Sequence, residues 1–439
     1  MANGEEVRIA DVVVIGGGFA GVVAARDLSH AGLDVVLVEA RDRLGGRTWS
    51  KESSLGHRLE MGGAYVHWLQ PHTWSEIMAH GLEVETMPEI PTAYWIADGE
   101  VRRESIDVFA GNLAPGLTGL AEGAREAFPF PYQPFPLTEA AKRADATSVG
   151  ERIAELGLDA DQLALARSYA SVLFHTSPDE GSLAHVLKLM ALCGGDWGLL
   201  IEASSGFQLA GGTGALIDAI QSRSTAEVRL STPIASVTTD GGHVDVVSTT
   251  GEIVQARQVI ITAPQNAVSS ITFDPPLAPE KQAALAEGIL AKGTKIWMLA
   301  KGKLDPFVAW AADGHPLTLT DWHYDQDGNT ILMSFGPVDP RVDPSDVRAV
   351  ETALREFLPD VELLAVDCQD WATDPYAQET WWAPRVGQVT KGFQDMLVPE
   401  ERVRFAGGDY AYGWAGFIDG AIESGRRAAT EVVDAIRGS

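Results

Sequence analysis

The stretch that decides the fold is residues 11–47, DVVVIGGGFAGVVAARDLSHAGLDVVLVEARDRLGGR. Its apolar run VVVI is typical of a buried strand, and the glycines after it follow the pattern G-x-G-x-x-G. Gly16 permits a tight turn, Gly18 lets a diphosphate approach the backbone, and Gly21 lets the next helix pack on the strand. Residues 19–30 have a helical period, so the first amides of that helix point towards the phosphates.

A second strand, residues 35–38, ends in Glu39. At this distance from the glycines, a carboxylate binds the ribose hydroxyls of an adenosine. A glycine turn alone also occurs in purely structural settings, but the strand, the spacing and the acid together indicate a dinucleotide-binding fold of the Rossmann type. The chain contains a single pattern of this kind, so the sequence offers no second nucleotide site for a nicotinamide coenzyme.

Composition narrows the class of protein. Apolar residues make up 45% and charged residues 21% of the 439 residues, which is typical of a folded globular chain. The formal net charge of −28 argues against nucleic-acid binding. Two cysteines, Cys193 and Cys368, neither build a disulfide framework nor match a metal site. The N-terminal MANGEEVRIA lacks a signal segment and no apolar run spans a membrane, so we expect a cytoplasmic protein with no metal.

The rest of the chain predicts two interleaved domains of an α/β (α+β) protein. Strand patterns at 228–230, 234–237, 244–247 and 259–262 return to the nucleotide fold. A second set at 93–96, 295–299 and 330–335, with a helix near 345–357 and helices across 138–202, suits a mixed-sheet and helical substrate domain. We expect the nucleotide-binding domain to comprise residues 1–80, 205–290 and 390–439, and the substrate domain to comprise 81–204 and 291–389.

Three motifs resemble the flavin monoamine oxidase family. Residues 41–47 (RDRLGGR) resemble its second glycine turn, and residues 60–67 (EMGGAYVH) resemble the segment beside the flavin ring. Residues 404–409 (RFAGGD) and 413–421 (GWAGFIDGA) resemble its C-terminal flavin motif. The resemblance spans nearly the whole chain and implies a Rossmann-like FAD-binding domain of the glutathione reductase type.

The resemblance also implies how FAD is held. Thr380 stands where mammalian relatives carry the cysteine that bonds to FAD, so we expect non-covalent FAD. Ile418 would offer a backbone amide to the flavin, and Asp409 would contact the ribityl chain. Arg43, by contrast, is expected to be part of a solvated charged turn. The implied FAD-binding residues are Gly16, Gly18, Gly21, Glu39, Arg41, Gly46, Arg47, Gly63, Ala64, Val237, Trp371, Gly408, Asp409, Trp414 and Ile418.

The implied chemistry is amine oxidation. A hydride leaves the carbon next to the amine nitrogen for flavin N5, the imine is hydrolysed in water, and O2 or a redox protein accepts the electrons. Lys295 would lie near N5 and assist reoxidation. Trp381 and Phe417 would form aromatic walls around the amine, and Tyr65 would line the same pocket.

The segments 62–72 and 293–297 most resemble the nicotine-catabolic branch of this family, that is, 6-hydroxynicotine oxidase and pseudooxynicotine amine oxidase. The expected substrate is therefore an aryl- or heteroaryl-linked small-molecule amine, and a homodimer is compatible with the sequence. A general aryl-alkyl monoamine oxidase is the alternative within the family. The alternative from another class is a non-redox binding protein like the prenylated-protein dissociation inhibitors, against which the intact glycines and Lys295 argue.

Overall fold

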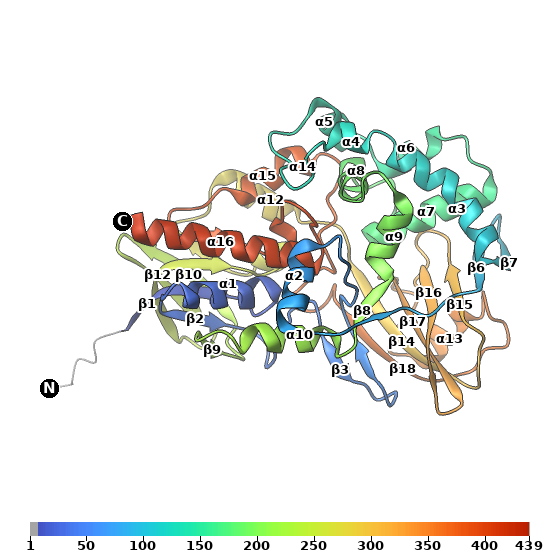
Figure 1. Cartoon of the computed structure of the whole chain (residues 1–439), viewed down its shortest axis with the longest axis horizontal. Coiled ribbons are helices and arrows are strands. Elements are labelled where there is room, and N and C mark those ends of the chain that lie inside the picture. Colours follow the sequence, from blue (N-terminus) through green and yellow to red (C-terminus); the bar gives the residue numbers. More distant parts are fainter. Residues whose placement is uncertain (1–7, 439) are drawn as a thin grey trace.

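The computed structural model describes residues 8–438, so the part of the signal-segment prediction that concerns residues 1–7 lies outside the described range. Within that range, two large sheets form the framework (Figure 1). The first has eight strands in the order β13 (Thr272–Asp274), β10 (Ile234–Asp240), β11 (His243–Ser248), β12 (Ile253–Ile261), β1 (Ile9–Ile15), β2 (Val35–Val38) and β9 (Glu227–Arg229), with β19 (Val403–Phe405) paired to β12. Pairing is parallel from β9 through β2, β1 and β12 to β19, as the Rossmann pattern predicts.

The second sheet has seven strands and is mostly antiparallel. Its order is β18 (Leu363–Asp370), β14 (Gly293–Ala300), β17 (Asn329–Pro337), β16 (Leu319–Gln326), β15 (Phe307–Trp310), β6 (Thr92–Ala97) and β7 (Glu100–Ser105). Two small sheets pair β3 (Ser50–Glu52) with β4 (Arg58–Glu60) and β5 (Val84–Thr86) with β8 (Phe207–Leu209). The strands of the two large sheets come from the separate stretches of sequence expected for two domains, and we propose the same division of the chain.

The central strand β1 is buried on both faces. Val12 and Val14 pack against helices α1 (Phe19–His30) and α16 (Ile418–Gly438), whereas Val13 and Ile15 pack on the opposite side with the valines of β10 and β11. Because side chains alternate along a strand, an unbroken apolar run fits a strand covered on both sides. Figure 1 shows the C-terminal helix α16 lying beside α1, so these two helices, which are distant in the sequence, lie next to each other on one face of the sheet.

Helices cover most of residues 138–202, which confirms the helical pattern expected there, and two further helices that the sequence analysis did not predict lie within residues 106–127. They are α3 (Ile106–Ala121), α4 (Ala124–Ala127), α5 (Glu139–Asp145), α6 (Val149–Glu155), α7 (Ala160–Phe174), α8 (Leu183–Leu192) and α9 (Trp197–Ser205). The others are α2 (Pro71–His80), α10 (Gly212–Gln221), α11 (Gln265–Val268), α12 (Pro279–Glu287), α13 (Val347–Leu354), α14 (Gln388–Lys391) and α15 (Phe393–Leu397). Across residues 8–438, no helix taken singly combines the length and apolar character that crossing a membrane requires; α8 and α9, bent by 86°, meet that test only when joined.

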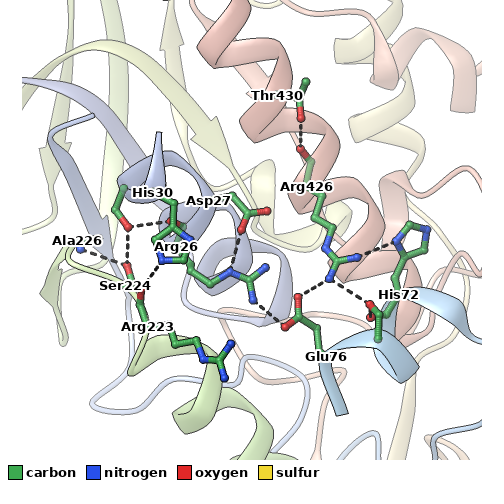
Figure 2. A network of polar contacts seen from close by, with 12 residues as sticks. Arg26, Asp27, His30, His72, Glu76, Arg223, Ser224, Ala226, Arg426 and Thr430 are labelled. Atoms are coloured by element: carbon green, nitrogen blue, oxygen red, sulfur yellow. Dashed lines mark hydrogen bonds and ion pairs between the residues drawn. The ribbon is translucent and has the colours of Figure 1, made fainter. Parts of the chain in front are cut away.

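A buried ionic network joins three helices that surround the nucleotide fold (Figure 2). Glu76 of α2 accepts hydrogen bonds from Arg26 of α1, at 2.7 Å, and from Arg426 of α16. Burial opposes the ionisation of Glu76, but the two guanidinium groups outweigh it and hold the pKa of this carboxyl below its ordinary value. The network therefore fixes α2 against the helix pair α1 and α16.

Candidate functional site

One cavity of about 840 Å³ runs between the two large sheets and takes its walls from both of them. This volume falls in the range of cofactor and substrate sites. The turn between β1 and α1, the second glycine turn and residues 232–235 line one part of it. Residues 62–65, β14 and the segment 415–418 line another part. Segments distant in the sequence therefore meet around a single space.

The two glycine turns contact each other. The backbone N–H of Gly45 donates to the carbonyl of Gly17 at 2.8 Å. A Cβ added to Gly18 would find its nearest neighbours 3.8 Å away, in the second turn, and Gly18 itself lines the cavity. Gly46 has φ +61°, a left-handed conformation that favours glycine. A side chain at Gly21 is excluded for another reason, since its Cβ would lie 1.9 Å from the carbonyl oxygen of Gly16.

Glu39 and Arg41 stand at the edge of this part of the cavity. The carboxylate of Glu39 accepts from the backbone N–H of Gly17 at 2.6 Å and from that of Arg41 at 2.8 Å. The Arg41 guanidinium forms an ion pair with Asp374 and lies 5.4 Å from the centre of the Tyr376 ring. The loop that carries Asp374 and Tyr376 follows β18 of the second sheet, so Arg41 joins the two sheets across the cavity.

Arg43 differs from the solvated residue expected from the sequence. Its guanidinium donates to the carbonyls of Leu44, Gly46 and Thr48 at 3.1 Å each, and it lies 4.6 Å from the centre of the Trp49 ring. Burial, together with the nearby Arg41 charge, lowers the pKa of Arg43 to about 10. Arg43 thus holds the second glycine turn in shape from behind.

Arg47 is engaged in a buried ionic cluster. It donates to Asp409 at 2.9 and 3.0 Å and to Glu379 at 2.7 Å. Both carboxylates are fully buried; burial first and the Asp409 charge second raise the pKa of Glu379 well above its ordinary value. Arg47 itself lines the cavity, whereas Asp409 stands behind it. The cluster links the second glycine turn to the C-terminal motif, and Glu379 carries no local sequence signal that would have identified it.

Lys295 of β14 reaches the cavity beside the segment 60–62. Its ammonium group donates to the carbonyl of Gly62 at 3.0 Å, and the indoles of Trp371 and Trp297 donate to the carbonyls of Met61 and Glu60. Burial lowers the pKa of Lys295 to about 8 despite the nearby acids. Two side chains of β14 and one that directly follows β18 therefore hold the segment that leads to Gly63, Ala64 and Tyr65, all of which line the cavity.

Trp381 and Phe417 both line the cavity, as does Tyr65. The Trp381 indole donates to the carbonyl of Leu173 at 2.7 Å, which fixes the plane of its ring. Phe417 packs edge-on against Trp414, with ring centres 5.0 Å apart. The structure thus brings the expected aromatic walls to the same space as Lys295. Cavity-lining aromatic and imidazole rings that the sequence analysis did not predict include Phe19, Tyr169, His185, Phe335, Tyr376 and Trp382.

Most of the expected FAD-binding residues lie on the cavity, with four placed elsewhere. Gly21 and Asp409 stand directly behind it, in the contacts given above. Val237 packs inside the core of the first sheet, and residues 232–235, just before it, reach the cavity instead. Trp414 is buried in the helical core, where its indole donates to Leu69 and Tyr132. Expected residues that line the cavity are Gly16, Gly18, Glu39, Arg41, Gly46, Arg47, Gly63, Ala64, Trp371, Gly408 and Ile418.

These residues fit an elongated dinucleotide such as FAD. Helix α1 begins at Phe19 with no side chain capping its first amides, and Gly18, Phe19 and Ala20 all line the cavity. Uncapped amides at a helix N-terminus bind a phosphate well. The helix α16 begins at Ile418, also on the cavity. Over residues 8–438, no group of three or more His, Cys, Asp and Glu side chains is arranged to hold a metal ion.

Comparison with known proteins also indicates a flavin-binding protein. The sequence model of the family described as flavin containing amine oxidoreductase matches residues 19–433. The chain is 38% identical to a nicotine dehydrogenase of Pseudomonas putida, over 96% of this chain and 88% of that protein. It is 30% identical to an (S)-6-hydroxynicotine oxidase of Paenarthrobacter nicotinovorans, over 96% and 99%. The fold matches the structure of a cyclohexylamine oxidase from Brevibacterium oxydans with a TM-score of 0.82, at 21% identity and over 98% and 100% of the two chains.

Proposed function

Because this chain belongs to the family of flavin containing amine oxidoreductases, we propose that it oxidises an aryl- or heteroaryl-linked amine of the kind met in nicotine catabolism. FAD bound in the cavity would accept a hydride from the carbon next to the amine nitrogen, which leaves an imine for water to hydrolyse. The observation that carries the proposal is that the two glycine turns, Lys295 and the Trp381 and Phe417 rings line one continuous cavity.

Each part of the cavity has a task in this proposal. The amides at the start of α1 and Glu39 would hold the diphosphate and the adenosine ribose. The faces of Trp381 and Phe417 would pack against the apolar part of the amine and so hold it in place. Orientation of the reacting carbon is the main contribution that such walls make to the rate. Lys295 would place a positive charge next to the flavin and so assist the transfer of electrons from the reduced flavin to O2 or to a redox protein.

We propose that FAD is bound without a covalent bond. The side chain of Thr380 ends in a hydroxyl group that donates to the carbonyl of Ala291 at 2.8 Å, and it offers no thiol for attachment. Precipitation of the protein with acid should therefore release all of the flavin into solution. Flavin that remains with the precipitate would contradict the proposal. Cytoplasmic location and a homodimeric state remain predictions.

The experiment that tests the function is anaerobic bleaching of the bound flavin by single amines. The panel contains pseudooxynicotine, both enantiomers of 6-hydroxynicotine, nicotine and phenethylamine. We expect a nicotine-type amine to bleach the flavin fastest. Faster bleaching by phenethylamine would favour the general aryl-alkyl monoamine oxidase instead. A protein that binds no FAD would overturn the proposal and favour a non-redox binding protein. Formation of hydrogen peroxide under air then identifies O2 as an acceptor.

A further inference from the structure

A phenol hydroxyl on the cavity wall has no partner in the fold. Tyr169 of α7 lines the cavity and is partly buried. Across residues 8–438 its hydroxyl makes no hydrogen bond to a protein atom, yet the oxygen keeps accessible surface. Burial raises the pKa of Tyr169 above its ordinary value, so the hydroxyl lies deep in the protein and keeps its proton. The surface that it keeps therefore faces the cavity, where a ligand can reach it.

The position of Tyr169 on its helix sets its distance from the proposed amine site. Val172 and Leu173, three and four residues later, also line the cavity, because residues with this spacing share one face of a helix. The carbonyl of Leu173 accepts from the indole of Trp381, an aromatic wall of the amine site. Tyr169 lies one turn of the helix before Leu173, at a distance of about 6 Å along the helix axis. It therefore lies beyond the wall that would hold the reacting carbon.

The register of the second sheet places Tyr169 in the same way. Lys295 of β14 is directly opposite Phe335 of β17, and both line the cavity. Phe335 in turn is opposite Leu319 of β16, and Leu319 is opposite Trp310 of β15. Opposed residues share a face, so these side chains form one row, whose ends are three strand spacings of about 4.8 Å apart. Tyr169 stacks on Trp310, with ring centres 6.1 Å apart, and therefore lies at the end of the row that is remote from Lys295.

We propose that Tyr169 determines substrate specificity: its hydroxyl donates a hydrogen bond to an acceptor in the aromatic ring of the amine, such as a pyridine nitrogen. This inference rests on the proposed function and narrows its substrate class to heteroaryl-linked amines. Val172, Leu173 and Phe335 give this part of the cavity an apolar wall, so one placed polar group fixes the orientation of the ring. A phenyl ring in the same place would leave the hydroxyl unpaired. The amine nitrogen takes no part in this bond, so secondary and tertiary amines can both form it.

The test uses pairs of probes that differ by one ring nitrogen. Nicotine is paired with 1-methyl-2-phenylpyrrolidine, and pseudooxynicotine with the amino ketone in which phenyl replaces pyridyl. The Kd of each probe is measured on the FAD-loaded protein from the concentration dependence of anaerobic flavin bleaching, or by competition for a probe that is not oxidised. We expect Tyr169→Phe to lower the ratio of the phenyl Kd to the pyridyl Kd by roughly 10-fold relative to the wild type. The basicity of each probe is the same for both proteins and cancels in this comparison.

Tyr65→Phe is the matched control, since Tyr65 also lines the cavity and its hydroxyl makes no hydrogen bond to a protein atom within residues 8–438. Tyr65 belongs to the segment held by Lys295, so this variant should keep the wild-type ratio. An unchanged ratio in Tyr169→Phe would overturn the inference, as would an equal fall of the ratio in Tyr65→Phe. Weakening of both members of a pair by the same factor, which a structural role of Tyr169 would produce, would overturn it too. Failure of the proposed function looks different: dithionite would bleach the wild-type flavin, and no amine would.

Discussion

The burial of Lys295 should make the stability of the protein depend on pH in a way that a single substitution removes. A lysine side chain ordinarily has a pKa of 10.5, and burial lowers the pKa of Lys295 to about 8. This lowering means that the folded protein is less stable by about 3 kcal/mol when Lys295 is protonated than when it is neutral, relative to the unfolded chain. The side chain is 7% exposed, so solvent screens little of this penalty.

The direction of the effect follows from proton binding. Between about pH 8 and 10.5, the unfolded chain holds a proton that folded Lys295 has lost, so the free energy of unfolding rises with pH in this window. Below about pH 8 the penalty is fully present. Lys295→Met removes the titrating group and keeps a side chain of similar length. We therefore expect the free energy of unfolding of the variant, relative to that of the wild type, to be higher at pH 7 than at pH 10.5. The change in this difference between the two pH values should be about 3 kcal/mol.

The assay is urea unfolding of the FAD-free proteins across this pH range, followed by tryptophan fluorescence. Other titrating groups are shared by both proteins and cancel in the difference. Lys301→Met is the matched control, because Lys301 directly follows β14 and its ammonium group is exposed beside Glu362. That variant should stay parallel to the wild type at every pH. Parallel curves for Lys295→Met as well would refute the argument from burial.

The same substitution tests the proposed role of Lys295 in reoxidation. With FAD bound, Lys295→Met should slow the reaction of the reduced flavin with O2 far more than the reduction of the flavin by amine. In the wild type, reoxidation should slow as pH rises through about 8, because the ammonium charge is lost there. Rapid mixing of pre-reduced protein with O2 measures this step separately. Equal effects on both half-reactions would contradict the role.

Two further substitutions test the framework of the site. Asp374→Asn should raise the Kd of FAD roughly 10-fold, because Arg41 loses its ionic partner across the cavity. The Kd is measured by titrating the FAD-free protein with FAD and following flavin fluorescence. An unchanged Kd would count against a role of this ion pair in FAD binding. Glu76→Gln should lower the free energy of unfolding at pH 7 by about 1.5–3 kcal/mol, because the buried guanidinium of Arg26 loses one of its two carboxylate partners and keeps Asp27. Since the pKa of folded Glu76 is lowered, this loss should shrink in urea unfolding as pH falls below 4.5, and a constant loss would contradict it.

The sequence predicted the parts of the site that depend on neighbouring residues. The strand, glycine turn and helix of residues 11–30 follow from the apolar periodicity and from the spacing of Gly16, Gly18 and Gly21, which lie within six consecutive residues. Glu39 was predictable for the same reason, since it directly follows β2. The pairing of the chain ends was predictable only through the family resemblance, because α1 and α16 are distant in sequence.

Contacts between distant residues escaped prediction. Glu379 lies 332 residues from its partner Arg47, and nothing in the sequence QETWW indicates a buried carboxylate. The surroundings of Val237 could not be derived from the sequence either: the register of β10 shifts between Ile234 and Ser236, and the Val237 side chain packs in the core whereas residues 232–235 line the cavity. Such irregularities depend on the partner strand and leave no mark in the apolar pattern.

Burial also determines which side chains of the proposed amine site are charged in this acidic protein. The net charge is −28, yet the one carboxylate among the described cavity-lining residues is Glu39, beside the glycine turn. Removal from water lowers the pKa of Lys295 to about 8 and that of both His175 and His185 to about 3. At neutral pH the lysine is therefore charged and both imidazoles are neutral. If the proposed function holds, a protonated amine would meet repulsion from Lys295 that Glu60 and Asp321 offset only in part, so we expect the site to favour the uncharged amine, the form that can release a hydride.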